Sequence, residues 1–259
     1  MYYSRKIILA INLACSSLVL AHSFVSNINI NGLYYDGFRP TEPAAHPITV
    51  GCQNAKGHAP ISAGDIIHVQ WNGWPESHKG PVLDYLASCG RESCETIDKN
   101  TLQFFKISQV GLVDGSKAPG LWGSDQLIAN NNSWVVEIPR HIRPGFYVMR
   151  TEIIALHNAS HEIGAQNYPQ CINLQISGNG TELPRGVLGK ELYDPEDPSL
   201  HLDISASMST YKIPGPTLIA GVETVTLSHP LPTGSGTPLT GTETTSRPTS
   251  TVMSDQTLS

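Results

Sequence analysis

Three histidines of this chain stand in distinctive local sequences: His22, His78 and His157. His22 directly follows a predicted signal peptide, so cleavage after Ala21 would make it the first residue of the mature chain. A terminal amine and an imidazole on the same residue can both bind one metal ion, which an internal histidine cannot do. The sequence therefore predicts a metal chelate that processing creates.

Residues 1–21 have the parts of a secretory signal: the basic pair Arg5 and Lys6, the apolar run Ile7–Leu20, and a cleavage site at Ala21. A membrane anchor is the alternative. Polar residues interrupt the apolar run, and it is shorter than the roughly 20 residues that a spanning helix needs. The sequence therefore predicts a secreted, extracellular protein that is not held in a membrane.

His78 and His157 lie where loops are expected. Gly73 and Pro75 precede His78 and shape a loop that can present an imidazole at a surface. Shortly after His157, the segment 164–171 brings together an amide, a phenol and a cysteine. The other histidines are expected to have surface or locally hydrogen-bonded roles; they are His46, His58, His68, His141, His161, His201 and His229.

Charge and cysteine content set the context for these residues. The formal net charge of the chain is -6, and loss of the basic signal peptide makes the mature chain more acidic still, which argues against nucleic acid or an anionic membrane as partner. Cys15 leaves with the signal, and two disulfides are expected among the remaining cysteines. Sequence alone allows three connectivities, but Cys89 and Cys94 suit a local loop, which leaves Cys52 to pair with Cys171. A zinc site is the competing interpretation, and the spacing does not favour it.

Apolar and polar residues alternate in Asp65–Trp71, around Trp134, and in Cys171–Ser177, which indicates half-buried strands. Gly and Pro clusters separate them, and a helical turn or two is expected only near Val82–Ser88. The predicted fold is all-β: an antiparallel immunoglobulin- or fibronectin-like β-sandwich with long loops and little helix.

Three segments are expected along the chain: the signal peptide 1–21, one domain over 22–228, and a disordered Ser/Thr/Pro-rich tail over 229–259. Candidate N-glycosylation sites are Asn131, Asn158 and Asn179.

Taken together in this order, the motifs resemble those of the fungal lytic polysaccharide monooxygenases of auxiliary activity family nine, formerly glycoside hydrolase family sixty-one. The resemblance covers His22 to about Leu218. The motifs that carry it are His22 after the signal, Ser77–Val82, Leu127–Trp134, Arg150–His157, Gly164–Cys171 and Tyr211–Pro216.

The resemblance implies one copper ion, cycling between Cu(II) and Cu(I). The amine and Nδ1 of His22 and Nε2 of His78 would be its nitrogen ligands, with Tyr168 on the axis. A planar set of nitrogen ligands suits Cu(II) on physical grounds as well.

The resemblance also gives roles to the residues around the metal. His157 and Gln166 would hydrogen-bond the copper-bound oxygen species, Arg150 would lie behind them, and Tyr211 would pack its ring on the sugar chain. At position 151, where the family commonly has histidine, this chain has Thr151.

The implied activity is oxidative cleavage of cellulose or a related β-1,4-glucan at C1, C4 or both. It would use O2 or H2O2 and an external electron donor, and the enzyme would act as a monomer. The alternatives are a glycoside hydrolase, which needs two carboxylates across a cleft, and a non-catalytic copper-binding or cellulose-binding protein of the same fold.

Overall fold

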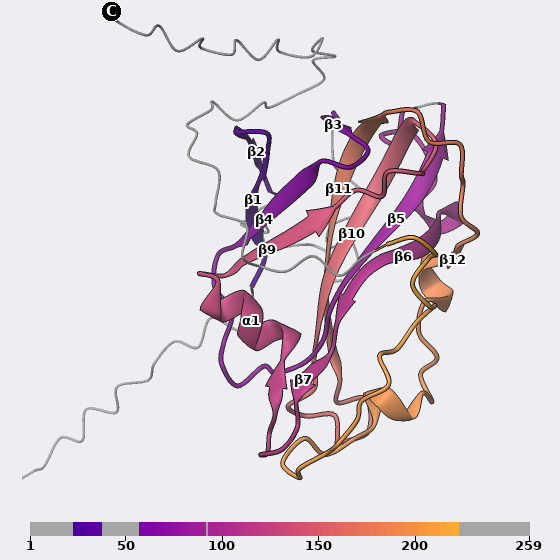
Figure 1. Ribbon diagram of the computed structural model, residues 1–259. Coiled ribbons are helices and arrows are strands. Elements are labelled where there is room, and N and C mark those ends of the chain that lie inside the picture. Colours follow the sequence, from indigo (N-terminus) through magenta and orange to yellow (C-terminus); the bar gives the residue numbers. More distant parts are fainter. Residues whose placement is uncertain (1–22, 38–56, 92, 223–259) are drawn as a thin grey trace, which may run out of the picture.

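A computed structural model describes residues 23–37, 57–91 and 93–222 (Figure 1). In this part of the chain two β-sheets pack face to face, and a single short α-helix lies at one end of them. The predicted all-β sandwich with little helix is confirmed. His22, Cys52 and the tail from His229 onward lie outside the described residues.

The smaller sheet has the strand order β2-β1-β4-β9, and the larger has the order β12-β6-β5-β10-β11-β3. The strands of the smaller sheet are β1 Val25–Ile30, β2 Leu33–Asp36, β4 Ile66–Trp71 and β9 Ser133–Glu137. Those of the larger are β3 Ala59–Ser62, β5 Val82–Gly90, β6 Gln103–Val110, β10 Gly145–Ala155, β11 Gln166–Ser177 and β12 Val187–Leu188. The short hairpin and the helix are β7 Leu112–Asp114, β8 Leu121–Trp122 and α1 Gly123–Ala129. All neighbouring strands run antiparallel except β3, which is parallel to β11.

The larger sheet is buried on both faces. On one face its side chains meet those of the smaller sheet, and the alternation of Ile67, Val69 and Trp71 along β4 supplies this core as predicted. On the other face Leu192, Leu200 and Ile204, from the segment that follows β11, close over β5, β6 and β10. Figure 1 shows this segment in orange.

Burial on both faces explains one wrong prediction. Val82–Ser88 forms most of the central strand β5 and no helical turn. A strand covered on both sides carries a nearly continuous apolar run, and such a run cannot be told from a buried helix by periodicity. The helix that does form, α1, has only 7 residues, too few to show a helical period. The Asp125 carboxylate accepts the Trp122 backbone N–H (2.8 Å) at its first turn.

The end of the described chain is tied to β6 through Lys106. Its ammonium group is buried and donates to the Pro214 carbonyl (2.7 Å) and to Gln109 Oε1 (2.9 Å). The Lys106 carbonyl accepts the Ile219 N–H (3.1 Å). Burial lowers the pKa of Lys106 to about 8. Main chain and side chain of one residue therefore hold the segment from Pro214 to Ile219.

The two sheets are also joined by a polar contact. Asp84 of β5 is fully buried, and its Oδ2 accepts the indole N–H of Trp134 on β9 (3.0 Å). Burial raises the pKa of this carboxyl group to about 6. The folded protein thus keeps the Asp84 carboxyl group protonated up to about pH 6.

Asp84 should make the fold less stable as the pH rises from 4 to 7. In the unfolded chain an aspartate releases its proton near pH 4, whereas the folded protein keeps the proton until about pH 6. Between these values the folded state binds more protons, so its free energy of unfolding falls with increasing pH, by about 3 kcal/mol from this residue. Urea unfolding of wild type and Asp84→Asn at several pH values measures the effect. Equal slopes in the two proteins would contradict the assignment.

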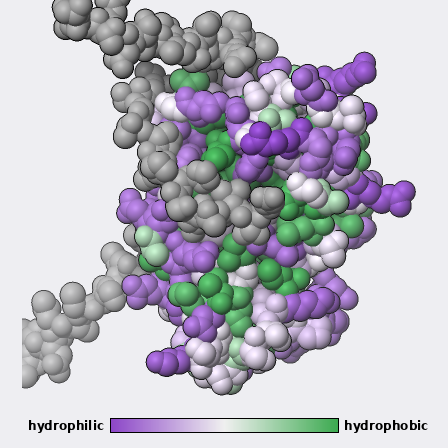
Figure 2. Space-filling view, in the orientation of Figure 1, coloured by the Kyte–Doolittle hydropathy of each residue, from purple (hydrophilic) through white to green (hydrophobic). Residues whose placement is uncertain are grey.

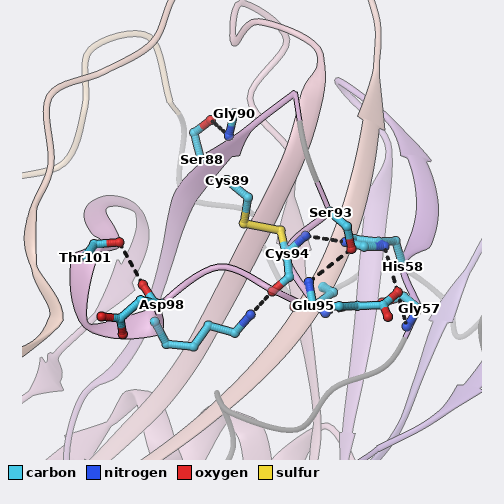
Figure 3. The surroundings of a disulfide bond; sticks show 12 residues. Gly57, His58, Ser88, Cys89, Gly90, Ser93, Cys94, Glu95, Asp98 and Thr101 are labelled. Carbon is cyan, nitrogen blue, oxygen red and sulfur yellow. Dashed lines mark hydrogen bonds and ion pairs between the residues drawn. A yellow bond between two sulfur atoms is a disulfide. The ribbon is translucent and has the colours of Figure 1, made fainter.

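Cys89, at the end of β5, and Cys94, in the following turn, form a disulfide as predicted (Figure 3). The Cys94 N–H donates to His58 Nε2 (3.0 Å), and the Lys99 ammonium donates to the Cys94 carbonyl. Cys171 is disulfide-bonded too; its predicted partner, Cys52, lies outside the described residues, so this pairing stays a prediction.

The Cys89–Cys94 bond closes a loop with a sequence separation of 5. Because a short closed loop removes little entropy from the unfolded chain, replacing both cysteines by alanine should lower the free energy of unfolding by only about 2 kcal/mol. Urea unfolding of the double variant under oxidising conditions checks this value. A loss as large as that expected for a long loop, about 4 to 5 kcal/mol, would show that the bond has a further role.

Candidate active site

Three segments bring the predicted site residues together at the end of the sandwich where α1 lies. The loop between β4 and β5 carries His78, and His157 lies just past the end of β10. Gln166 and Tyr168 open β11, whose first residues pair with the last of β10: Gln166 with Ala155, and Tyr168 with Ile153. The antiparallel register therefore brings the segment just before His157 alongside Gln166 and Tyr168, and the His78 ring lies 6.4 Å from the Tyr168 ring.

The imidazoles of His78 and His157 lie close together, with ring centroids 4.0 Å apart. Ser77 Oγ lies 3.0 Å from His78 Nδ1, which leaves Nε2 as the ring nitrogen open to a further ligand. The His78 backbone is fixed on both sides, because its N–H donates to the Pro75 carbonyl (2.9 Å) and its carbonyl accepts the Trp74 indole N–H (2.8 Å).

Tyr168 and Gln166 form a direct pair: the tyrosine hydroxyl donates to Gln166 Oε1 (2.9 Å). Trp74 packs its ring edge-on against both sides of the site, with centroids 4.9 Å from Tyr168 and 6.1 Å from His78. Sequence reasoning did not single out Trp74. Trp74 could have been recognised from the sequence, because a large aromatic residue between Gly73 and Pro75 is unusual in the loop that carries His78.

The surroundings of both imidazoles favour their neutral form. Burial, and secondarily the neighbouring His157, lower the pKa of His78. Burial also lowers the pKa of His157, and it raises the pKa of the Tyr168 hydroxyl. His157 Nδ1 is buried, and no hydrogen-bond partner for it exists within the described part of the chain. Neutral imidazoles are the form that binds a transition metal.

The segment that follows His22 is anchored next to this cluster. The Phe24 N–H donates to Asn72 Oδ1 (2.9 Å), and the Asn72 N–H donates back to the Phe24 carbonyl (3.0 Å). The Val25 N–H donates to Gln170 Oε1 on β11 (3.3 Å). Within the described residues no group of three or more His, Cys, Asp or Glu side chains could hold a metal ion.

Arg150 does not touch the cluster but lies within a buried ion pair. Its guanidinium donates to Glu152 Oε2 from Nε (3.0 Å) and Nη2 (2.9 Å). The Tyr193 hydroxyl donates to the same oxygen (2.7 Å), and Asn167 Nδ2 donates to Glu152 Oε1 (2.8 Å). Sequence reasoning missed Glu152, although it lies two residues after Arg150 in the same motif.

Tyr211 is half-buried. Its ring packs edge-on against the buried Trp122 (centroids 4.8 Å apart), and its hydroxyl donates to the Ser199 carbonyl (3.1 Å). Burial raises the pKa of this hydroxyl. The structure thus places Tyr211 in the packing between α1 and the C-terminal segment, and no contact among the described residues joins it to His78. The side chains of Asn131, Asn158 and Asn179 are exposed.

Apolar side chains are exposed on the same side as α1. Figure 2 shows hydrophobic residues in the lower half of the face drawn, where α1 and β7 lie in Figure 1. Val113 and Leu121 of the β7–β8 hairpin are each nearly half exposed. The Ser124 N–H at the start of α1 donates to the Gly80 carbonyl (3.1 Å), which joins this region to the loop that carries His78.

Fold and site together define a class: β-sandwich proteins with two imidazoles, an amide and a phenol gathered at one end of the sheets. The family model of Auxiliary Activity family 9 (formerly GH61) matches residues 22–211. The chain belongs to this family of lytic polysaccharide monooxygenases, oxidoreductases that cleave polysaccharides oxidatively.

Relatives and solved structures agree. The chain is 49% identical over 236 residues to AA9 family lytic polysaccharide monooxygenase E of Emericella nidulans, a match that covers 80% of this chain and 58% of that protein. It is 47% identical over 249 residues to monooxygenase G of the same organism, covering 84% and 91% of the two chains. The extended catalytic domain of H. jecorina LPMO9A superposes with a TM-score of 0.71 at 42% identity, covering 86% of this chain and 97% of that one. Within the described residues, no helix has the length and apolar character needed to cross a bilayer.

Proposed function

We propose that this protein is a secreted copper enzyme that oxidises β-1,4-glucan chains, cellulose first among them, at C1, C4 or both. The observation that carries the proposal is the state of His78. Its Nδ1 lies 3.0 Å from Ser77 Oγ, which would leave Nε2 for a metal ion, and the ring lies 4.0 Å from that of His157.

His22 supplies the remaining nitrogen ligands in this proposal, its amine and Nδ1. The hydrogen bonds of Phe24 and Val25 to Asn72 and Gln170 support this, because they tie the segment after His22 to the loop of His78 and to β11. His22 is two residues from Phe24, a span of about 7 Å at full extension. Neutral imidazoles and a primary amine are donors that copper prefers.

Bound copper would supply one-electron redox chemistry, with an external reductant and O2 or H2O2 as co-substrates. The surrounding residues orient these reactants. Tyr168 would be a further residue at the copper, with its hydroxyl held by Gln166 Oε1, and this bond leaves the Gln166 amide N–H groups as donors to the oxygen co-substrate. His157 offers a neutral ring whose Nδ1 has no partner among the described residues, so it can hold or pass a proton there.

The surface around the site suits a glucan chain. Exposed apolar side chains of the β7–β8 hairpin, Val113 and Leu121, lie beside α1 and can pack on the C–H faces of sugar rings. We place Tyr211 at the edge of this surface, with its hydroxyl already held by Ser199. Secretion, glycosylation at the three sequons and action as a monomer belong to the same proposal.

The test is a turnover assay on the protein whose N-terminus is verified as His22. With one equivalent of copper, cellulose and ascorbate, it should release aldonic acids, 4-ketosugars or both, identified by mass spectrometry. A matched protein with one alanine added before His22 should release none, because the added residue removes the terminal amine from the chelate. Stoichiometric copper binding without oxidised products would leave a copper carrier of the same fold and contradict the enzymatic proposal.

A further inference from the structure

Glu152 is a buried anchor next to the site. Its carboxylate is inaccessible to solvent and is held by charged and neutral donors: Arg150 and Tyr193 at Oε2, and Asn167 at Oε1. Tyr193 is itself fixed by the Tyr85 hydroxyl (3.0 Å). A buried carboxylate with a guanidinium and a phenol on one oxygen has little freedom to move.

Among the partners of Glu152, Asn167 is adjacent in sequence to residues of the candidate site. It lies between Gln166 and Tyr168 at the start of β11, and side chains alternate between the two faces of a strand. Tyr168 packs toward the core between the sheets, so Asn167 projects toward the opposite face, where Glu152 lies. The residue itself is exposed, while its amide reaches the buried carboxylate.

Within the described residues, the first part of β11 has a strand neighbour on one side only. Gln166–Ile176 pairs with β10, but the second neighbour, β3, pairs only with Leu174–Ser177. The first residues of β11 follow directly on the loop 157–165 and are held by side-chain contacts in addition to β10. Strand ends of this kind open readily unless a side chain holds them.

We propose that Asn167 is a positioning residue, whose bond to the Arg150–Glu152 ion pair holds Gln166 and Tyr168 in place at the copper site. The proposal deepens the proposed function and rests on it for the role of the two neighbours. It also gives Arg150 a defined part: Arg150 acts through Glu152 and Asn167 and not by direct contact with the site.

Asn167→Ala and Asn167→Asp test the bond without breaking the buried ion pair. Alanine removes the amide, and aspartate keeps its shape but loses the N–H donor and adds a negative charge facing Glu152. Gln175→Ala is the matched control, because Gln175 is an exposed residue of the same strand and the same face, far from the site. All variants should fold, with thermal midpoints within a few degrees of wild type.

The first readout is amide hydrogen exchange over residues 164–172 of the metal-free protein. It should become about tenfold faster in Asn167→Ala, as expected for loss of a hydrogen bond to a charged group, and at least as fast in Asn167→Asp. Gln175→Ala should exchange as wild type. Wild-type exchange in both Asn167 variants would overturn the proposal.

The second readout is the EPR spectrum of the Cu(II)-loaded protein, together with kcat and KM. Displacement of Tyr168 should change the EPR parameters and lower kcat several-fold, with KM little changed. Unchanged spectra and kcat would also overturn the proposal. The exchange experiment needs no copper. If the protein fails to bind copper but Asn167→Ala still exchanges faster at residues 164–172, the proposed function fails while the structural role of Asn167 stands.

Discussion

His78→Ala should weaken copper binding by more than about 100-fold and abolish the release of oxidised sugars. Loss of a group that merely orients a metal ligand costs about 10- to 100-fold in affinity, so loss of a ligand should cost at least that much. His78 offers Nε2 alone, because Ser77 engages Nδ1. The side chain is only partly buried, so the fold should survive the substitution.

Two further variants serve as an intermediate case and as a control for the loss of copper affinity in His78→Ala. Ser77→Ala removes the hydrogen bond that fixes the imidazole but keeps the ring, so its copper affinity should fall by about 10-fold. His161→Ala removes an exposed imidazole four residues after His157 and should bind copper as wild type does. Calorimetric titration measures all three. Wild-type affinity in His78→Ala would exclude His78 as a ligand.

Gly80→Ala should destabilise the protein by about 3 kcal/mol or more and disable the site at the same time. A β-carbon at Gly80 would lie 1.8 Å from the Ile154 carbonyl oxygen, so the backbone of the loop or of β10 would have to move. Gly80 also exchanges hydrogen bonds with Ser124 of α1, donating to its Oγ (3.0 Å) and accepting its N–H (3.1 Å). Displacement of Gly80 would therefore shift His78, two residues earlier.

The matched control is Gly189→Ala. A β-carbon there would meet the ring of Phe104 at 3.3 Å, a contact that a shift of a few tenths of an ångström relieves, whereas Gly80 faces a backbone clash. Urea unfolding gives the two stabilities, and calorimetric titration gives the copper affinities. If Gly80→Ala folds with wild-type stability and binds copper normally, the close packing of this loop on β10 does not position His78.

How far the sequence predicts this fold depends on how each strand is covered. Alternation identifies β4 because one face of that strand points to the core between the sheets. It fails for β5, which is covered on both faces, so that apolar residues follow one another without a period. Helix α1 is too short to show a period at all, and Asp125 at its first turn is the only local sign of it.

The candidate site divides in a similar way. His78, His157, Gln166 and Tyr168 are recognisable because their types and local motifs are unusual, and the structure brings all four together. Residues that support the site from the opposite face of a strand have no unusual local motif. Glu152 stands between Thr151 and Ile153 on β10, and only the pairing of β10 with β11 shows that it meets Asn167.

The surroundings of Tyr211 could not be predicted from its motif. The sequence marks an aromatic residue near the end of the domain, but it does not reveal that Trp122, far away in the chain, packs against that ring. A contact of this kind depends on how the C-terminal segment crosses the larger sheet.

The anchoring of the C-terminal segment by Lys106 has a consequence for where this domain can be cut. The family match ends at residue 211, yet Pro214 accepts the buried ammonium group and Ile219 pairs with β6. A truncated chain ending at Tyr211 would leave a buried cation without its carbonyl partner and would remove the backbone pairing of Leu218 and Ile219 with Lys106 of β6. The autonomous folding unit is thus longer than the stretch that identifies the family, and an expression boundary must lie beyond Ile219.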